Sequence, residues 1–177
     1  GRSARLGAVD LSGAAVRFPG LRREQDGRTV VFADAPGGSQ VPDAVVEAMA
    51  DYLRRSNANA HGSFATSQET DDLIAEAHAA AADLLNADED EVVFGPNATT
   101  LLFSISRSIA RSLEPGDEVV VTRLDHDANV RPWVLAADDA GAKVRWGDIR
   151  DDDATLDLAS FEAALSERTK IVAFTLA

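Results

Sequence analysis

The stretch EVVVTRLDHDANVRPWVLAADDAGAKVRW, residues 118–146, decides the fold. It opens with a strand pattern at 118–122, continues into a helical pattern over 129–140, and ends in a second strand pattern at 143–146. Gly141 follows the helical pattern directly, as is typical of a helix that ends in the left-handed conformation. A strand, a helix and another strand in this order predict a parallel β-α-β unit.

The same alternation extends to both sides of this stretch. Upstream, residues 91–94 are expected to form a strand and residues 98–113 a helix. Downstream, Asp157 is placed to cap a short helix over 158–165, and the apolar run 170–176 predicts a strand buried on both faces. The pattern therefore predicts an α/β fold with a mostly parallel, doubly wound sheet. The positions expected on the buried side of the helix 98–113 are Leu101, Leu102, Ile105 and Ile109.

The first half of the chain carries weaker signals. Residues 30–33 are a strand candidate, and Pro42 fits the first turn of a helix. An aperiodic loop at 56–63 is followed by a helix that Thr66 and Glu69 would open as a capping box, and that should end near Asn86. We expect residues 1–29 to be an N-terminal segment and residues 30–177 to belong to one α/β domain.

Composition narrows the function classes. The chain has 177 residues, is 45% hydrophobic and 27% charged, and carries a formal net charge of −13. This is the composition of a globular protein, and its negative charge opposes binding to nucleic-acid phosphates or to anionic membranes. It has no cysteine, which excludes disulfides and thiolate metal sites in these residues. Without a secretory signal pattern or a long apolar run, a cytoplasmic enzyme is the expectation.

Two strand-to-helix junctions carry candidate chemistry, and the first is Asn97-Ala98-Thr99-Thr100. Free backbone N–H groups and two hydroxyls at a helix N-terminus favour a bound phosphate. The alternative is simple capping, with Asn97 as the N-cap, and on spacing alone capping is favoured. The Gly-Lys-Ser/Thr ending of a Walker A loop is absent.

The second junction is Asp125-His126-Asp127, directly after a predicted strand. Ligands of open α/β sheets collect at the carboxyl ends of strands, so a histidine here is placed to act on one. A metal site is a weaker interpretation, because adjacent residues seldom point at one ion. A surface loop with a helix cap at Asp127 or Asn129 is the remaining interpretation, and on this segment alone it is favoured.

The order of motifs along the chain favours a functional interpretation of the two strand-to-helix junctions. The segments at 34–40, 57–61, 97–100 and 125–133 occur in an order and spacing that resemble the cysteine desulfurase-like branch of the class V aminotransferases. The resemblance covers the chain from Val30 onward and implies the first half of a pyridoxal-phosphate enzyme of fold type I, the aspartate aminotransferase-like fold. It implies pyridoxal 5'-phosphate as the cofactor.

The resemblance also implies roles for individual residues. His126 would stack on the cofactor ring and could shuttle protons, and Asn97, Ala98 and Thr99 would bind the phosphate. The residues implied on the substrate side are Gly37, Gly38, Asn59 and His61. An amino-acid substrate and a homodimer are further implications, and a sulfur-acceptor protein is a candidate partner. Desulfuration, transamination, racemisation and elimination all stay open.

The family's Schiff-base lysine and its ring-nitrogen aspartate are implied to lie beyond Ala177. Lys143 and Lys170 each begin a predicted strand and match structural positions. We therefore expect Ala177 to be a break in a longer enzyme, and these residues alone to be inactive. The alternatives are a non-catalytic binding or assembly module that keeps part of this fold, and an unrelated α/β domain that holds a nucleotide or phosphosugar.

Overall fold

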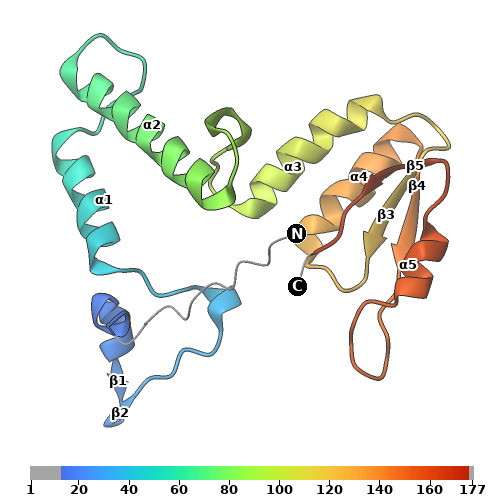
Figure 1. Cartoon of the computed structure of the whole chain (residues 1–177), viewed down its shortest axis with the longest axis horizontal. Coiled ribbons are helices and arrows are strands. Elements are labelled where there is room, and N and C mark those ends of the chain that lie inside the picture. Colours follow the sequence, from blue (N-terminus) through green and yellow to red (C-terminus); the bar gives the residue numbers. More distant parts are fainter. Residues whose placement is uncertain (1–12, 176–177) are drawn as a thin grey trace, which may run out of the picture. The chain divides into compact units, whose positions relative to one another are not determined.

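The computed structural model of the chain describes residues 13–175 (Figure 1). Its contacts divide the chain into two compact units, with the division between Val92 and Val93. This division falls inside the residues 30–177 that the sequence assigns to one domain. The boundary between residues 29 and 30 stays a prediction.

A parallel sheet forms the centre of the second unit. Its strands are β3 (Glu118–Thr122), β4 (Lys143–Gly147) and β5 (Thr169–Val172), in the order β4-β3-β5. All five residues of β3 are buried, because this strand pairs on both edges and helices pack against the sheet. The prediction of an α/β fold with a parallel sheet is confirmed.

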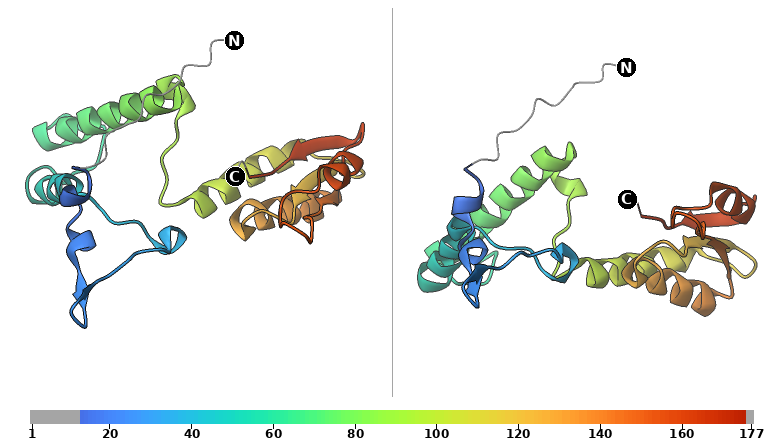
Figure 2. Two further views of the ribbon diagram at one scale, coloured as in Figure 1. Left: turned by 60° about the horizontal axis from the view of Figure 1, so that its bottom comes forward. Right: turned by 90° about the horizontal axis from the view of Figure 1, so that it is seen from below.

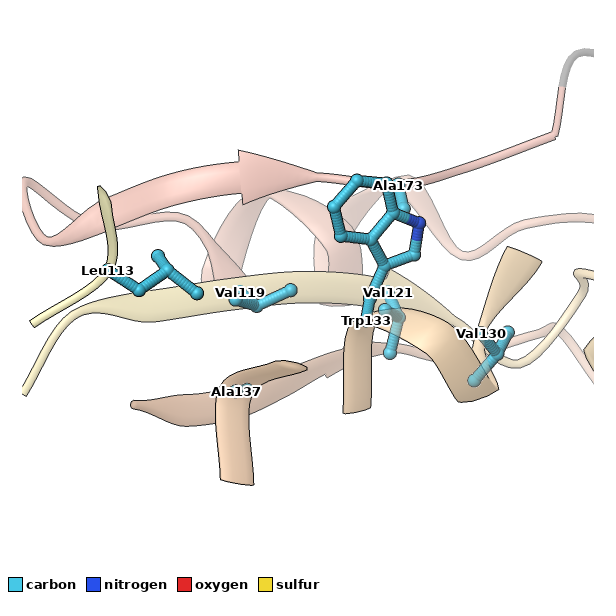
Figure 3. Packing of buried hydrophobic residues seen from close by; sticks show 7 residues of the cluster. All are labelled: Leu113, Val119, Val121, Val130, Trp133, Ala137 and Ala173. Carbon is cyan, nitrogen blue, oxygen red and sulfur yellow. The ribbon is translucent and has the colours of Figure 1, made fainter. Parts of the chain in front are cut away.

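Helices cover both faces of this sheet, which makes it doubly wound. On one face, α4 (Arg131–Ala140) packs Trp133 against Val121 of β3 and Ala173 beyond β5 (Figure 3). On the other face lies α5 (Leu158–Ala164), where a Cβ on Gly147 would come within 3.0 Å of the Phe161 ring.

The remaining helices of the second unit lie next to α4. The helix α3 (Ala98–Ile109) packs against α4 and continues into a 3-10 turn, η5 (Ala110–Ser112). A second turn, η6 (Asp127–Asn129), leads from β3 into α4. Figure 2 shows these elements in yellow to red from two further directions.

The first unit is built around two helices. They are α1 (Asp43–Arg55) and α2 (Ala65–Leu85), which Figure 2 shows in green as a straight helix. Every helix within residues 13–175 is too short or too polar to span a lipid bilayer. The shorter elements are η1 (Ala15–Arg17), η2 (Pro19–Arg22), β1 (Glu24–Gln25), β2 (Arg28–Thr29), η3 (Ala35–Gly37) and η4 (Glu89–Glu91).

Several predicted boundaries are confirmed by their caps. Gly141 ends α4 with a φ of 67°, and Asn86 ends α2 with a φ of 54°, both in the left-handed region. The Asp157 carboxylate accepts hydrogen bonds from the backbone N–H groups of Ala159 and Ser160 and so begins α5. These caps act within one turn of the helix, so the sequence shows them directly.

The strand predicted at residues 30–33 is wrong. Strand pairing occurs just before it, in the antiparallel hairpin of β1 and β2. Asp26 and Gly27 form the turn with φ values of 52° and 71°. An Asp-Gly pair between short extended segments is a strong hairpin signal, and it was available in the sequence.

The strand predicted at residues 91–94 is also wrong. Glu91 ends η4, and the side chains of Val93 and Phe94 are 70% and 55% exposed. A strand needs a neighbour to satisfy its backbone groups. This segment pairs with no strand within residues 13–175.

The predicted capping box at Thr66 and Glu69 does not form. The helix α2 begins one residue earlier, after Phe64, and the Ser56 hydroxyl donates a hydrogen bond to the Glu69 carboxylate instead. A capping box does form at Asp88 and Glu91, where it opens η4. Both sites match the spacing of the motif, so the spacing alone does not select between them.

Two burial predictions need correction. Strand β5 is at the edge of the three-stranded sheet and alternates between half-buried and exposed residues, so it is not buried on both faces. On α3, Ile105 and Ile109 are exposed at 47% and 41%, whereas Ser106 is buried at 1%. The face that α4 covers is therefore the one carrying Ser106, one residue around the helix from the predicted face.

Candidate functional site

The loop after β3 lies at the carboxyl end of the parallel sheet, where ligands of open α/β sheets bind. A shallow cavity of about 250 Å³ opens there. Its lining combines a cation, two carboxylates and an aromatic ring, supplied by Thr122, Arg123, Asp125, Asp127, Val130 and Trp146. The cavity borders the residues on either side of His126.

Hydrogen bonds to the residues on either side of it in the loop orient His126. Its Nδ1 atom accepts a hydrogen bond of 3.0 Å from the backbone N–H of Ala128, and its own backbone N–H donates to the Asp125 carboxylate at 2.8 Å. A ring nitrogen that accepts a hydrogen bond carries no proton in the neutral imidazole. This geometry therefore assigns the proton of neutral His126 to Nε2.

A chain of hydrogen bonds anchors this loop in the hydrophobic core. The second oxygen of Asp125 accepts from the Asn129 amide at 2.7 Å, and the Asn129 oxygen accepts from the Trp133 indole N–H at 3.3 Å. Trp133 is only 6% exposed. The loop conformation, and with it the ring of His126, is thus tied to the buried face of α4.

The N-terminus of α3 has a side-chain cap, but two of its backbone N–H groups have no acceptor among the described residues. The side-chain oxygen of Asn97 accepts a hydrogen bond of 2.8 Å from the N–H of Thr100, which confirms the capping interpretation. Within residues 13–175, no acceptor is found for the backbone N–H groups of Ala98 and Thr99. Two free donors, the helix dipole and the Thr99 hydroxyl fit an anion.

Both predicted junctions belong to the second unit, and the elements that follow them, α3 and η6, are in contact. The turn η6, which follows His126, packs against α3. The pairing of a donor-rich helix N-terminus with an aromatic ring fits the phosphate and the ring of pyridoxal phosphate. The chemistry of Asn97, Ala98, Thr99 and His126 fits the cofactor that the family resemblance implies, and their role as its binding residues stays a prediction.

Arg123 is the cation that lines the cavity beside this loop. Its guanidinium lies 4.9 Å from the centre of the Trp146 ring and forms an ion pair of 2.7 Å with Asp148. Thr122, beside it, has a buried hydroxyl without a hydrogen-bond partner in the described part of the chain. Among those same residues, no cluster of three or more histidine, aspartate or glutamate side chains could hold a metal ion.

Both lysines lie at the other end of the sheet. Lys143 begins β4 opposite Glu118, and Lys170 is the second residue of β5. His126 instead follows the carboxyl end of β3. The lysines therefore begin strands, as predicted, at the end of the sheet opposite to the candidate site.

Asn59 and His61 belong to the first unit, in a loop that α2 holds by hydrogen bonds. The Ser67 hydroxyl donates to the carbonyl of Asn59 at 2.5 Å and accepts from the N–H of Gly62 at 2.6 Å. The backbone N–H of His61 donates to both oxygens of Asp71, at 3.0 and 3.1 Å. Sequence reasoning missed Asp71, because nothing in its spacing marks it as a partner of the loop.

Gly37 and Gly38 lie where the first unit turns. Gly37 ends η3, and Gly38 has a φ of 144°, which favours glycine. Gly38 also lines an apolar cavity of about 280 Å³ together with Phe18 and Phe32. A role for these glycines, and for Asn59 and His61, on the substrate side stays a prediction.

Comparison with known proteins decides the family. The family model described as aminotransferase class-V matches residues 31–177, which is most of the chain. The chain belongs to this family. Among its class V relatives is a probable cysteine desulfurase of Streptomyces coelicolor, 34% identical over 178 residues, which covers 96% of this chain and 42% of that protein.

Solved structures agree with this class V assignment. The apo structure of the cysteine desulfurase from Thermococcus onnurineus has a TM-score of 0.73 at 30% identity, and covers 81% of this chain and 36% of its own. The cysteine desulfurase CsdA from Escherichia coli has a TM-score of 0.72 at 25% identity. The match covers 93% of this chain and 41% of the CsdA chain. The chain thus spans about two fifths of the length of the relatives it matches.

Proposed function

We propose that this chain is the N-terminal part of a pyridoxal-phosphate-dependent enzyme that acts on an amino acid, in the cysteine desulfurase-like branch of its family. The observation that carries the proposal is the N-terminus of α3, where Ala98 and Thr99 offer unpaired N–H groups, in a helix that packs against the turn after His126. The class V family membership and the likeness to cysteine desulfurases support the same assignment.

The residues of this chain would hold the cofactor by its two ends. The N–H groups of Ala98 and Thr99 and the Thr99 hydroxyl would bind the phosphate, while Asn97 keeps its oxygen on Thr100. The His126 ring would cover the aromatic face, with its Nε2–H available as a donor. When bound, the cofactor supplies an electron sink for bond breaking at the α-carbon of an amino acid.

We also propose that residues 1–177 by themselves do not turn over substrate. Covalent catalysis by this cofactor needs a lysine amine. Lys143 and Lys170 lie at the amino ends of β4 and β5, away from His126. A homodimer and a sulfur-acceptor partner stay predictions from the family resemblance.

The test is cofactor uptake by the full-length enzyme. We expect the purified protein to bind pyridoxal phosphate, with an absorbance band in the visible range. Replacing Thr99 by Val should weaken cofactor binding roughly tenfold or more, because a hydrogen bond to a charged group is lost. The matched control is Ser108→Ala, whose hydroxyl bonds to the Ser104 carbonyl within the same helix.

The outcomes separate the alternatives. A folded full-length protein that takes up no pyridoxal phosphate would contradict the proposal and favour a non-catalytic module. Product analysis with cysteine and with other amino acids then identifies the reaction. Release of sulfur with formation of alanine would indicate desulfuration, and a keto acid would indicate transamination or elimination.

A further inference from the structure

One face of α1 is apolar and uncovered in the described part of the chain. Its side chains recur every three or four residues, as the positions on one side of a helix do, and are 45–63% exposed. They are Val45, Val46, Met49 and Leu53. Within residues 13–175, no residue of α1 is buried. A contiguous apolar surface on a globular protein indicates a site of contact with another surface.

The helix α2 approaches this face from one side. The Tyr52 hydroxyl of α1 lies 3.1 Å from the Thr70 hydroxyl of α2. Asp43 and Arg54 are eleven residues apart, which is close to three full turns, so they lie on the same side of α1 as each other. Tyr52 precedes Arg54 by two residues and therefore lies on the opposite side. The border of the apolar face that carries Asp43 and Arg54 is thus the one away from α2.

The charges at this border are self-complementary. Asp43 begins α1 and Arg54 lies in its last turn. The ion pair that α1 forms within residues 13–175 joins Arg55 to Asp51 at 2.9 Å, and Asp43 and Arg54 take part in none there. A second α1 in antiparallel orientation would bring its Arg54 to Asp43 of the first helix and its Asp43 to Arg54. The two-fold axis of such a pair passes close to Met49, near the midpoint of the helix.

An apolar cavity of about 720 Å³ lies at the amino end of the same helix. It is lined by the first residues of α1, which include Val45, and by Val16 and Phe18 of the segment before it. In the antiparallel arrangement, Leu53 of the second copy lies opposite Val45, because each is four residues from Met49. The apolar side chain that ends one face therefore meets the cavity that begins the other, and the two-fold axis repeats this contact.

We propose that α1 pairs antiparallel with α1 of a second copy of this chain, across a two-fold axis close to Met49. The apolar faces pack on each other, Leu53 enters the cavity of the other copy, and Asp43 pairs with Arg54 at both ends. Specific dimers bury about 1,200–2,000 Å² in total, more than one pair of short helices supplies, so the surface around the cavity belongs to the interface. The pairing involves no cofactor and is independent of the proposed function.

The first experiment is a disulfide cross-link in the full-length protein. A residue on a two-fold axis faces its own copy, and a disulfide requires Cα atoms about 4.4–6.8 Å apart. Residues 1–177 contain no cysteine, so a thiol placed in α1 is new to this region. Under mild oxidation we expect Met49→Cys to cross-link roughly fivefold more than Ala48→Cys, an exposed position on another side of the same helix. Peptide mapping by mass spectrometry identifies the bond between the two copies of residue 49.

The second experiment reverses the charges and measures the dimer dissociation constant by sedimentation. Asp43→Arg and Arg54→Asp should each raise this constant roughly three- to tenfold, because each brings like charges together at two symmetric places. The double variant restores opposite charges across the axis and should return the constant to within about twofold of the wild type. Both residues also suit the dipole of their own helix, and a purely intrahelical role predicts no such recovery. Arg55→Asp, which makes the same charge change one residue away, is the control and should have no effect.

A monomeric full-length protein, equal cross-linking at positions 48 and 49, or a double charge variant that does not recover would each overturn the pairing. A thiol at position 49 that resists a soluble thiol reagent without cross-linking would show that another part of the enzyme covers the face, which also overturns it. These measurements do not depend on cofactor uptake. Failure of the pairing therefore leaves the proposed function intact, and failure to bind pyridoxal phosphate leaves the pairing intact.

Discussion

Asn97 shows how one residue can support two interpretations that compete in the sequence. As an N-cap it uses its side-chain oxygen on the N–H of Thr100. A phosphate at the same helix end would use the N–H groups of Ala98 and Thr99, which have no acceptor within residues 13–175. The cap and the ligand therefore use different donors, and the cap orders the helix end at which the ligand would bind.

Replacing Asn97 by Ala should destabilise the second unit. The Thr100 N–H would lose its acceptor, at a cost of about 1 kcal/mol in the free energy of unfolding. Denaturant unfolding followed by circular dichroism measures the loss. Asn97→Ser, which keeps a capping oxygen, should retain most of the stability, and an Ala variant as stable as the wild type would contradict the cap.

Trp133 links the His126 loop to the core through Asn129. Replacing Trp133 by Phe keeps an aromatic ring in the core but removes the indole donor. In a double-mutant cycle with Asn129→Ala, we expect a coupling energy of about 1 kcal/mol, the net contribution of one hydrogen bond. Asp138→Ala, combined with the same Trp133 variant, is the control and should show no coupling.

At the scale of elements, left-handed residues mark where helices and loops end. Gly141 has a φ of 67°, and a Cβ added there would lie 3.7 Å from Pro115, so space is available and only the backbone conformation is costly. Replacing Gly141 by Ala should therefore cost roughly 1–2 kcal/mol of stability. Thermal or denaturant unfolding tests this value.

Ala154 gives the reciprocal test of the same principle. It has a φ of 58° in the loop between β4 and α5. Glycine adopts this conformation without strain, so Ala154→Gly should be neutral or stabilising, in contrast to Gly141→Ala. Equal destabilisation by both substitutions would show that backbone strain does not explain either.

The elements that the sequence predicts well are those with local determinants. Strand β3 matches its predicted bounds, and the caps at Gly141 and Asp157 act within one helical turn. The strand predictions at 30–33 and 91–94 fail because a strand also needs a partner, which no local pattern reveals. The pairing of strands that are distant in the sequence could therefore not be predicted from local patterns.

In the candidate site, too, the sequence reveals local features but not the contacts between distant residues. The sequence marks His126 because it follows a strand between two aspartates, and marks Asn97–Thr99 because they open a helix. It does not reveal that Ala128 donates to His126, or that Asp71 holds His61 from ten residues away. Those contacts depend on backbone conformation, including a left-handed His61, which residue spacing does not encode.

At the scale of the whole molecule, the loss of stability in acid depends on carboxylates that are paired in the folded state. The chain has 30 acidic and 17 basic side chains. Glu118 is buried at the start of β3, where it accepts hydrogen bonds from Ser166 at 2.7 Å and Arg168 at 3.3 Å. The Ser166 hydrogen bond, aided by the charges of Arg145 and Arg168, lowers the pKa of Glu118 below its ordinary value of 4.5.

Two carboxylates in the loop after β4 also have lowered pKa values. A hydrogen bond from Arg150 lowers the pKa of Asp152, and one from Thr155 lowers the pKa of Asp153. A carboxyl group whose pKa is lower in the folded than in the unfolded state binds protons more readily when unfolded. Its contribution to stability is complete above the unfolded pKa and is lost as the pH falls through the folded pKa.

We therefore expect the free energy of unfolding to fall as the pH is lowered through and below the ordinary pKa values of glutamate, 4.5, and aspartate, 3.8, with Glu118 as a buried contributor. A Glu118→Gln variant should be less stable at neutral pH, because Arg168 loses its charged partner, and should show a shallower loss on acidification. Denaturant midpoints measured across this pH range compare it with Glu167→Gln, an exposed neighbour that removes the same charge. If the two variants lost stability in parallel with the wild type on acidification, the buried carboxylate of β3 would not be a source of the acid sensitivity.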